Sequence, residues 1–240
     1  MERGVIQEVA LYSNELQEEM ELLIYVPANY SPLYKYTVII MSDGRDYFQM
    51  GRVSRTADAL LETNEIENVI LVGIPYKSVK DRWEKYHPDG SQHAAYVRFL
   101  AHEVVPYLDR EYPTYQIGNG RALMGDSLAA TVSLLTAIKY PNSFGRVIMH
   151  SPMVDETVLE KVKSFTEPHA FSIYHVIGEE ETEVPTTQGG RENFLEPNRT
   201  LHQLLEQKGF SSFYEEFAGG HTWKYWQRDM ERALRLNFGQ

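Results

Sequence analysis

The sequence of 240 residues contains no cysteine, which excludes disulfide scaffolds, thiol nucleophiles and metal centres held by cysteine. Long apolar runs are also missing: no segment approaches the roughly 20 apolar residues of a membrane helix, and the N-terminus lacks a signal-peptide core. Basic residues are in deficit, with 23 Lys and Arg against 34 Asp and Glu, and the net charge of -11 argues against a nucleic-acid partner. We therefore expect an acidic cytoplasmic protein with no membrane partner, whose nucleophile must be an oxygen or a nitrogen.

The hydrophobic pattern alternates between strand-like and helix-like segments along the chain. Segments 5–12 and 20–26 alternate apolar and polar residues, which predicts a hairpin. Unbroken apolar runs, typical of parallel strands buried on both faces, occur at 36–41, 69–74, 146–149 and 171–177, and shorter strands are expected at 121–124 and 213–217. Helical patterns cover 55–63, 94–110, 128–139, 156–164, 199–208 and 223–236.

This order predicts an α/β fold formed by a single domain over residues 1–240. We expect a mostly parallel central sheet of about eight strands with helices on both faces, the arrangement of an open doubly wound sheet. Functional residues in such folds lie on loops that leave the carboxyl ends of strands. The longest irregular stretches, 75–93 and 179–198, are expected to be lid loops over the site.

The motif Gly125-Asp126-Ser127-Leu128-Ala129 stands between an expected strand and an expected helix. A serine on so sharp a turn presents its hydroxyl to a substrate, as in a nucleophile elbow. The N–H of Leu128, at the start of the helix, can donate to an oxyanion. A serine that only caps the helix would give the same pattern, but the strand before it and the helix after it favour the elbow.

A serine nucleophile needs an imidazole base and an acid behind that base. In α/β hydrolases these follow in the order serine, acid, histidine. His221 follows Gly219-Gly220 after an expected strand and is the candidate base, with His150 as its competitor at another strand end. The loop after segment 171–177 offers four carboxylates for the acid: Glu179, Glu180, Glu181 and Glu183. Because this loop must bend back to reach the histidine, we expect the acid to be Glu181, with Glu180 as second choice.

A second oxyanion donor is expected in the loop after segment 36–41, which reads Asp43-Gly44-Arg45. Gly44 permits a tight turn, so the backbone N–H of Arg45 can point toward Ser127. By itself, Asp-Gly is only a turn signal.

The set of motifs resembles a known family. Asp43-Gly44-Arg45, Gly125 to Leu128, Gly178 to Glu181 and Gly220-His221-Thr222-Trp223-Lys224-Tyr225-Trp226 are together similar to the Putative esterase family of α/β hydrolases, which contains esterase D and the enterochelin esterases. The resemblance runs from about Val5 to the C-terminus, and its most specific element is His-x-Trp-x-x-Trp after Gly-Gly. The segment 81–86 is similar to a family loop near the site.

The resemblance implies a serine carboxylic-ester hydrolase that acts through an acyl-enzyme with a Ser-His-Glu triad and needs no metal or organic cofactor. Its substrate would be a small-molecule ester, which the motifs do not select. The family spacing of glycine, two residues and an acid adds weight to Glu181. Ala129 and Ala130 stand where family elbows usually have glycine, so the helix is expected to pack slightly farther from the sheet.

Four further residues are candidates for the substrate pocket: Arg82, Trp83, Trp223 and Trp226. Arg82 would suit an anionic acyl group, whereas core packing explains at least one of the tryptophans near His221 equally well. Two other functions remain open. One is a non-catalytic binding protein on the same fold, and the other is metal-assisted hydrolysis through His87, His93 and His102, although no His-Glu-x-x-His motif is present. The oligomeric state is also open, a homodimer included.

Overall fold

The computed structural model describes residues 2–187 and 189–240. Its central sheet has eight strands in the order β1-β2-β4-β3-β5-β6-β7-β10. At the N-terminal edge, the pairs β1–β2 and β2–β4 are antiparallel. The remaining pairs of the sheet, from β4–β3 to β7–β10, are parallel. The strands are β1 (Val5–Ser13), β2 (Glu18–Val26), β3 (Thr37–Ser42), β4 (Val69–Ile74), β5 (Arg121–Asp126), β6 (Arg146–His150), β7 (Ser172–Gly178) and β10 (Ser211–Phe217). A separate two-stranded ribbon joins β8 (Val184–Pro185) and β9 (Arg191–Glu192).

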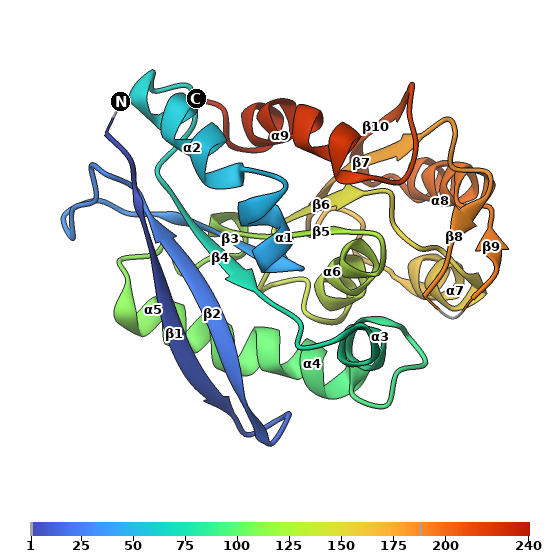
Figure 1. The fold of residues 1–240 in the computed structure, drawn as a ribbon, viewed down its shortest axis with the longest axis horizontal. Coiled ribbons are helices and arrows are strands. Elements are labelled where there is room, and N and C mark those ends of the chain that lie inside the picture. The colour runs from blue at the N-terminus through green and yellow to red at the C-terminus, as the bar shows by residue number, and fades with distance from the viewer. Residues whose placement is uncertain (1, 188) are drawn as a thin grey trace.

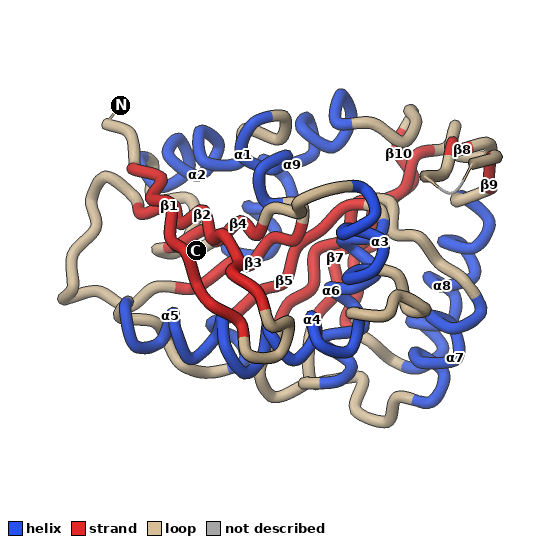
Figure 2. Tube along the Cα trace, turned by 60° about the horizontal axis from the view of Figure 1, so that its bottom comes forward, coloured by secondary structure: helices blue, strands red, loops and turns tan. Residues whose placement is uncertain are grey.

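Helices cover both faces of the sheet (Figures 1 and 2). One face carries α1 (Gly44–Gln49), α2 (Val53–Glu62) and α9 (Trp223–Phe238), and the other carries α3 (Val79–Tyr86), α4 (His93–Phe99), α5 (Val105–Glu111), α6 (Leu128–Lys139), α7 (Glu156–Ser164) and α8 (Leu195–Lys208). The β8–β9 ribbon lies at the same end of the sheet as α8 (Figure 1). The predicted α/β fold and its mostly parallel sheet are confirmed.

The core has two parts because successive residues of a buried strand point to opposite faces. In β3, Val38 and Ile40 belong to the apolar cluster under α4 to α8, whereas Ile39 and Met41 belong to the cluster under α1, α2 and α9. All of these side chains are buried. The unbroken apolar runs of the sequence are therefore explained by helices on both sides.

Several elements differ from the sequence-based expectation. The segment 94–110 forms two helices, α4 and α5, joined by a π-helical turn, η1 (Leu100–Val104). The segment 75–93 is not wholly irregular, because it contains α3. α8 begins four residues before position 199, and α1 was not expected. Among residues 2–187 and 189–240, no helix is both long and apolar enough to cross a membrane.

Candidate active site

The candidate site residues lie where parallel strands end. β3 leads into the Asp43 turn, β5 into Ser127, β7 into the loop with Glu181, and β10 into the loop with His221. The carboxyl ends of parallel strands share one edge of a sheet, so residues far apart in the sequence meet there. Arg82, on α3 after β4, comes to the same edge.

The turn at Ser127 is sharp and strained. Ser127 has φ 52° and ψ -124°, a conformation that few non-glycine residues adopt. Its N–H donates to the carbonyl oxygen of His150 at 2.9 Å, which fastens the turn to β6. Gly125 must be glycine, because a Cβ there would lie 2.2 Å from the carbonyl carbon of Ala129. Helix α6 thus lies directly against β5 at the elbow even though Ala129 replaces the usual glycine.

His221 and Glu181 form a close polar pair. The Nδ1 atom of His221 is 2.7 Å from Oε2 of Glu181. Glu181 is 1% exposed, whereas Glu179, Glu180 and Glu183 are exposed to solvent. The other carboxylate oxygen, Oε1, accepts from the N–H of Gly178 at 2.9 Å. Of the four carboxylates in the loop, the structure brings Glu181 to the histidine.

Ser127 and His221 line one cavity of about 100 Å³. Its wall comes from both segments that we expected to be lid loops and from the loops after β5 and β6. The lining residues are Arg82, Trp83, His87, Ser127, Leu128, Met153, Val184, Pro185, Thr186, Thr187, Glu192, Phe194 and His221. Within the described ranges, the Ser127 hydroxyl makes no hydrogen bond. The hydroxyl remains available to a substrate. Hydrogen bonds between catalytic side chains are often long or absent without substrate and tighten only when the substrate binds.

Arg82 lies at the cavity, but its charge is paired. Its Nε is 3.0 and 2.9 Å from the two carboxylate oxygens of Asp43, and its Nη2 donates to the carbonyl oxygen of Asp126 at 3.3 Å. Burial raises the pKa of Asp43 despite the opposing effect of Arg82. Burial, reinforced by the charge of Asp43, raises the pKa of Asp126 well above its usual range. Arg82 therefore connects the elbow to the turn after β3, and Asp43 balances its charge at the cavity.

The turn after β3 differs in detail from the expectation. Asp43, not Gly44, takes the left-handed conformation, with φ 58°. Gly44 is required by close packing, since a Cβ there would lie 2.2 Å from Cα of Gly73 in β4. Arg45 and Leu128 lie in the first turns of α1 and α6, where N–H groups have no partner within the helix. The Arg45 side chain turns away to pair with Glu21 at 2.7 Å.

The two tryptophans after His221 are not among the residues that line the cavity. Trp226 is 3% exposed and packs edge-on against the His221 ring, with 4.9 Å between ring centroids. Trp223 packs edge-on against Tyr47 and Trp226. Of the four candidate pocket residues, Arg82 and Trp83 thus line the cavity, and the other two support α9 and the histidine.

Comparisons with known proteins place the chain in a family and show its fold. The sequence profile of the Putative esterase family matches residues 13–236. The chain belongs to the Putative esterase family. The uncharacterised protein YjcH of Bacillus subtilis is 56% identical to it over 97% of each chain. The enterochelin esterase of Shigella flexneri superposes with a TM-score of 0.82 at 17% identity, over 97% of this chain and 57% of that one. The BES protein of Bacillus cereus has a TM-score of 0.80 at 17% identity, over 98% of this chain and 95% of that one.

The family expected from the sequence motifs is therefore confirmed, and it supports ester hydrolysis as the activity of this chain. The structural likenesses show the α/β-hydrolase fold.

His150, the competing histidine of this esterase, occupies a different environment. Its ring is fully buried, with Nδ1 3.1 Å from the hydroxyl of Tyr47 and Nε2 3.1 Å from Oδ2 of Asp229. Both ring nitrogens are engaged in the core on the side of α1 and α9. This leaves neither nitrogen for a proton from Ser127.

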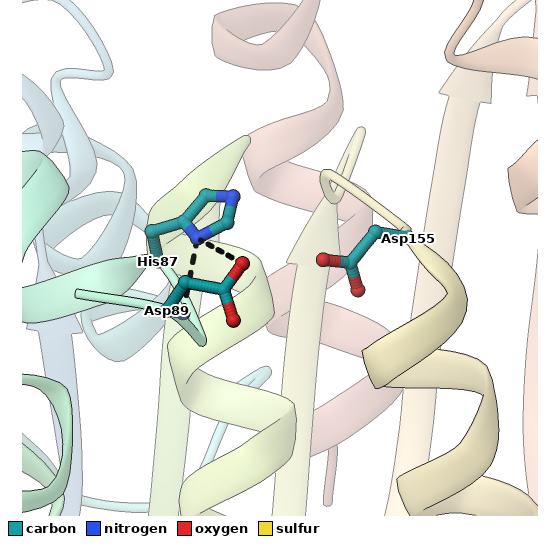
Figure 3. A group of neighbouring side chains, drawn as sticks. All are labelled: His87, Asp89 and Asp155. Carbon is teal, nitrogen blue, oxygen red and sulfur yellow. Dashed lines mark hydrogen bonds and ion pairs between the residues drawn. The ribbon is translucent and has the colours of Figure 1, made fainter.

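A group of possible metal ligands lies at the rim of the cavity and contains His87, Asp89 and Asp155, not His93 or His102 (Figure 3). The ligand atoms of the three side chains lie within 4.8 Å of one another. Two hydrogen bonds of the group are local: His87 Nδ1 accepts from the N–H of Asp89 at 3.1 Å, and Asp155 caps α7 by accepting from the N–H of Val158 at 2.8 Å. Asp155 faces the other two across a gap in Figure 3.

Sequence reasoning missed several residues of the site. Met153 and Phe194 line the cavity, and Ser151 contacts the Glu181 carboxylate. Ser151 follows the carboxyl end of β6, so its position at a strand end was the available signal. Nothing in the sequence near Phe194 marks it, because it reaches the site through the fold of the long segment after Glu181.

Proposed function

We propose that this family member is a serine carboxylic-ester hydrolase that acts through an acyl-enzyme, with Ser127 as nucleophile, His221 as base and Glu181 as acid. The observation that carries the proposal is the 2.7 Å contact of His221 with a buried carboxylate at the cavity that Ser127 also lines. The strained turn at Ser127 adds support, because strain of this kind is concentrated at functional sites.

The chemistry follows from these positions. Since Nδ1 of His221 donates to Glu181, Nε2 of the neutral ring is the nitrogen that can accept a proton. Ser127 Oγ attacks the ester carbonyl carbon and gives its proton to that nitrogen. The tetrahedral intermediate then expels the alcohol, which takes up the proton and leaves the acyl group on Ser127. A water molecule, deprotonated by His221, attacks the acyl-enzyme, and the acid is released as the Ser127 proton returns.

The negative charge on the carbonyl oxygen needs donors that are already in place. The backbone N–H groups of Leu128 and Arg45 are the proposed donors, because both belong to the first turns of helices that follow the neighbouring strands β5 and β3. The Arg45 side chain is engaged by Glu21, so only its backbone would take part. No cofactor or metal enters these steps.

The substrate is proposed to be a small-molecule ester with a short acyl group. A cavity of about 100 Å³ beside Ser127 holds few heavy atoms, well below the roughly 300 to 1,000 Å³ of sites for drug-sized ligands. The lining by Trp83, Met153 and Phe194 is apolar and suits a hydrocarbon acyl group.

A fluorophosphonate probe tests the proposal. We expect one covalent adduct by intact-mass analysis, located on Ser127, and its loss in Ser127→Ala. Hydrolysis of p-nitrophenyl acetate should fall by about 10³-fold or more in that variant. Ser164→Ala, which removes an exposed hydroxyl at the end of α7, is the control and should label fully. Absence of labelling in the wild-type protein would favour a non-catalytic binding role, and an active Ser127→Ala enzyme would refute the serine mechanism.

A further inference from the structure

A buried hydroxyl stands behind the proposed triad acid. Ser151 Oγ donates to Oε1 of Glu181 at 2.6 Å and accepts from Nε1 of Trp226 at 3.0 Å. All three residues are buried, at 0%, 1% and 3% exposure respectively. The contacts form a continuous chain from the indole of α9 through Ser151 to the carboxylate and on to His221.

The directions of these hydrogen bonds are fixed by the donors available. The indole N–H can only donate, so it occupies a lone pair of the Ser151 oxygen. The hydroxyl proton is then free to point at Glu181, which when ionised can only accept hydrogen bonds and therefore cannot be the donor of this contact. Oε1 thereby receives two donors, Ser151 and the N–H of Gly178, and Oε2 is left to His221. The carboxylate cannot rotate without breaking buried hydrogen bonds.

The backbone at Ser151 is also unusual. Its φ is 50°, a left-handed conformation that is strained for a non-glycine residue. A glycine would adopt this conformation without strain, but it would lack the hydroxyl. Ser151 thus has a strained backbone and a hydroxyl that donates to the Glu181 carboxylate.

We propose that Ser151, supported by Trp226, is a positioning residue that holds the Glu181 carboxylate so that one oxygen faces His221. This inference rests on the proposed function, because it assigns the carboxylate a role in the hydrolysis. The contacts with Glu181, and not the local backbone, are the means by which Ser151 acts.

Two substitutions at one position separate the hydroxyl from the backbone. Ser151→Ala removes the hydroxyl and keeps the strain, whereas Ser151→Gly removes both. Each should lower kcat for p-nitrophenyl acetate by about 10-fold to 100-fold, as expected for a hydrogen bond to a charged group, with KM changed by less than about twofold. Ser133→Ala is the matched control, because Ser133 is equally buried but donates to the carbonyl oxygen of Ala129 within α6. A Ser151→Gly enzyme with the turnover of the control would overturn the proposal, since the hydroxyl that contacts Glu181 would then be dispensable.

A spectroscopic readout reports the acid directly. The proton between His221 Nδ1 and Glu181 gives a low-field signal in the proton NMR spectrum, and the signal should move in Ser151→Ala and Trp226→Phe but not in Ser133→Ala. Trp226→Phe keeps an aromatic ring and loses the N–H, so it also tests the proposal if the position 151 variants do not fold. An unmoved signal and unchanged kcat in Trp226→Phe would refute the role of the chain of hydrogen bonds.

The two proposals can fail separately. Ser127→Ala measured in the same assay decides the proposed function, because an active Ser127→Ala enzyme removes the serine mechanism altogether. An inactive Ser127→Ala enzyme beside fully active variants at position 151 would leave the serine mechanism intact and refute only the positioning role.

Discussion

Replacing Asp126 by asparagine should stabilise the protein at neutral pH. Asp126 directly precedes Ser127 and is 5% exposed, and its Oδ1 has no hydrogen-bond partner in the part of the chain that the structure describes. Burial and the nearby charge of Asp43 raise its pKa well above the usual range. Asparagine has nearly the same shape, carries no charge and brings a donor to a site rich in carboxylates. Relief of an unpaired buried acceptor is worth about 1 to 3 kcal/mol.

The pH dependence of the gain follows from the sign of the shift. A carboxyl group whose pKa is raised on folding binds a proton more tightly in the folded state, so its contribution to stability is greatest below the unfolded pKa, about 4, and is lost as pH rises. The advantage of Asp126→Asn should therefore be small near pH 4 and larger near pH 7.

Urea unfolding at the two pH values measures the effect, with a rise in melting temperature at pH 7 of about 2 to 10 °C as a second sign. Asp89→Asn removes the same charge from a side chain that is 72% exposed and should change the free energy of unfolding little. A variant that is less stable than wild type at pH 7, or equally stabilised at pH 4, would show that the buried carboxylate is not the cost we assign to it.

Three further outcomes are expected. Glu181→Gln should lower turnover by up to about 10⁴-fold, because the imidazole loses its tautomer, whereas the exposed Glu180→Gln should keep full activity; the reverse pattern would move the acid to position 180. His221→Ala should match Ser127→Ala in loss of hydrolysis, while His150→Ala should mainly lower the melting temperature, since its ring joins Tyr47 and Asp229 in the core. Among p-nitrophenyl esters, kcat/KM should be higher for acetate than for octanoate, because the cavity has a volume of about 100 Å³; equal values would show that the size of this cavity does not limit the acyl group.

The sheet could be predicted from the sequence because its strands are apolar on both faces. The helices that were missed, α3 and α1, depend on contacts with residues of other elements or on buried ion pairs. Helix α3 reads as a charged, irregular segment, yet Lys85 on it is 1% exposed and pairs with Asp81 at 2.6 Å. Ion pairs allow charged residues to be buried, and a hydrophobic pattern cannot register such burial. The short α1 was missed because it begins at Gly44, which reads as a turn residue in the sequence. Its glycine is required by close packing against Gly73 in β4, a contact that the sequence does not reveal.

For the site, local patterns indicated Ser127 and His221 because each stands in a motif between defined elements. Loop length and the family spacing favoured Glu181 among four carboxylates, but its burial depends on tertiary structure: it lies beside Phe194, whose N–H donates to its carbonyl oxygen at 2.9 Å. The contact of Ser151 with Glu181 joins residues 30 positions apart, and no local pattern encodes it. Sequence thus identifies the chemistry of such a site better than the hydrogen bonds that orient it.

The parallel pairing of β7 with β10 has a consequence for how the protein acquires its activity. Glu181 and His221 come together only when Ser172–Gly178 aligns with Ser211–Phe217, after the chain has closed a loop that includes α8. Pairings between such distant segments are slow steps in folding. During refolding, the central strands β3, β4 and β5 and most helices can form while Glu181 and His221 are still apart. Recovery of hydrolysis therefore reports completion of the C-terminal edge of the sheet, whereas circular dichroism reports the earlier secondary structure.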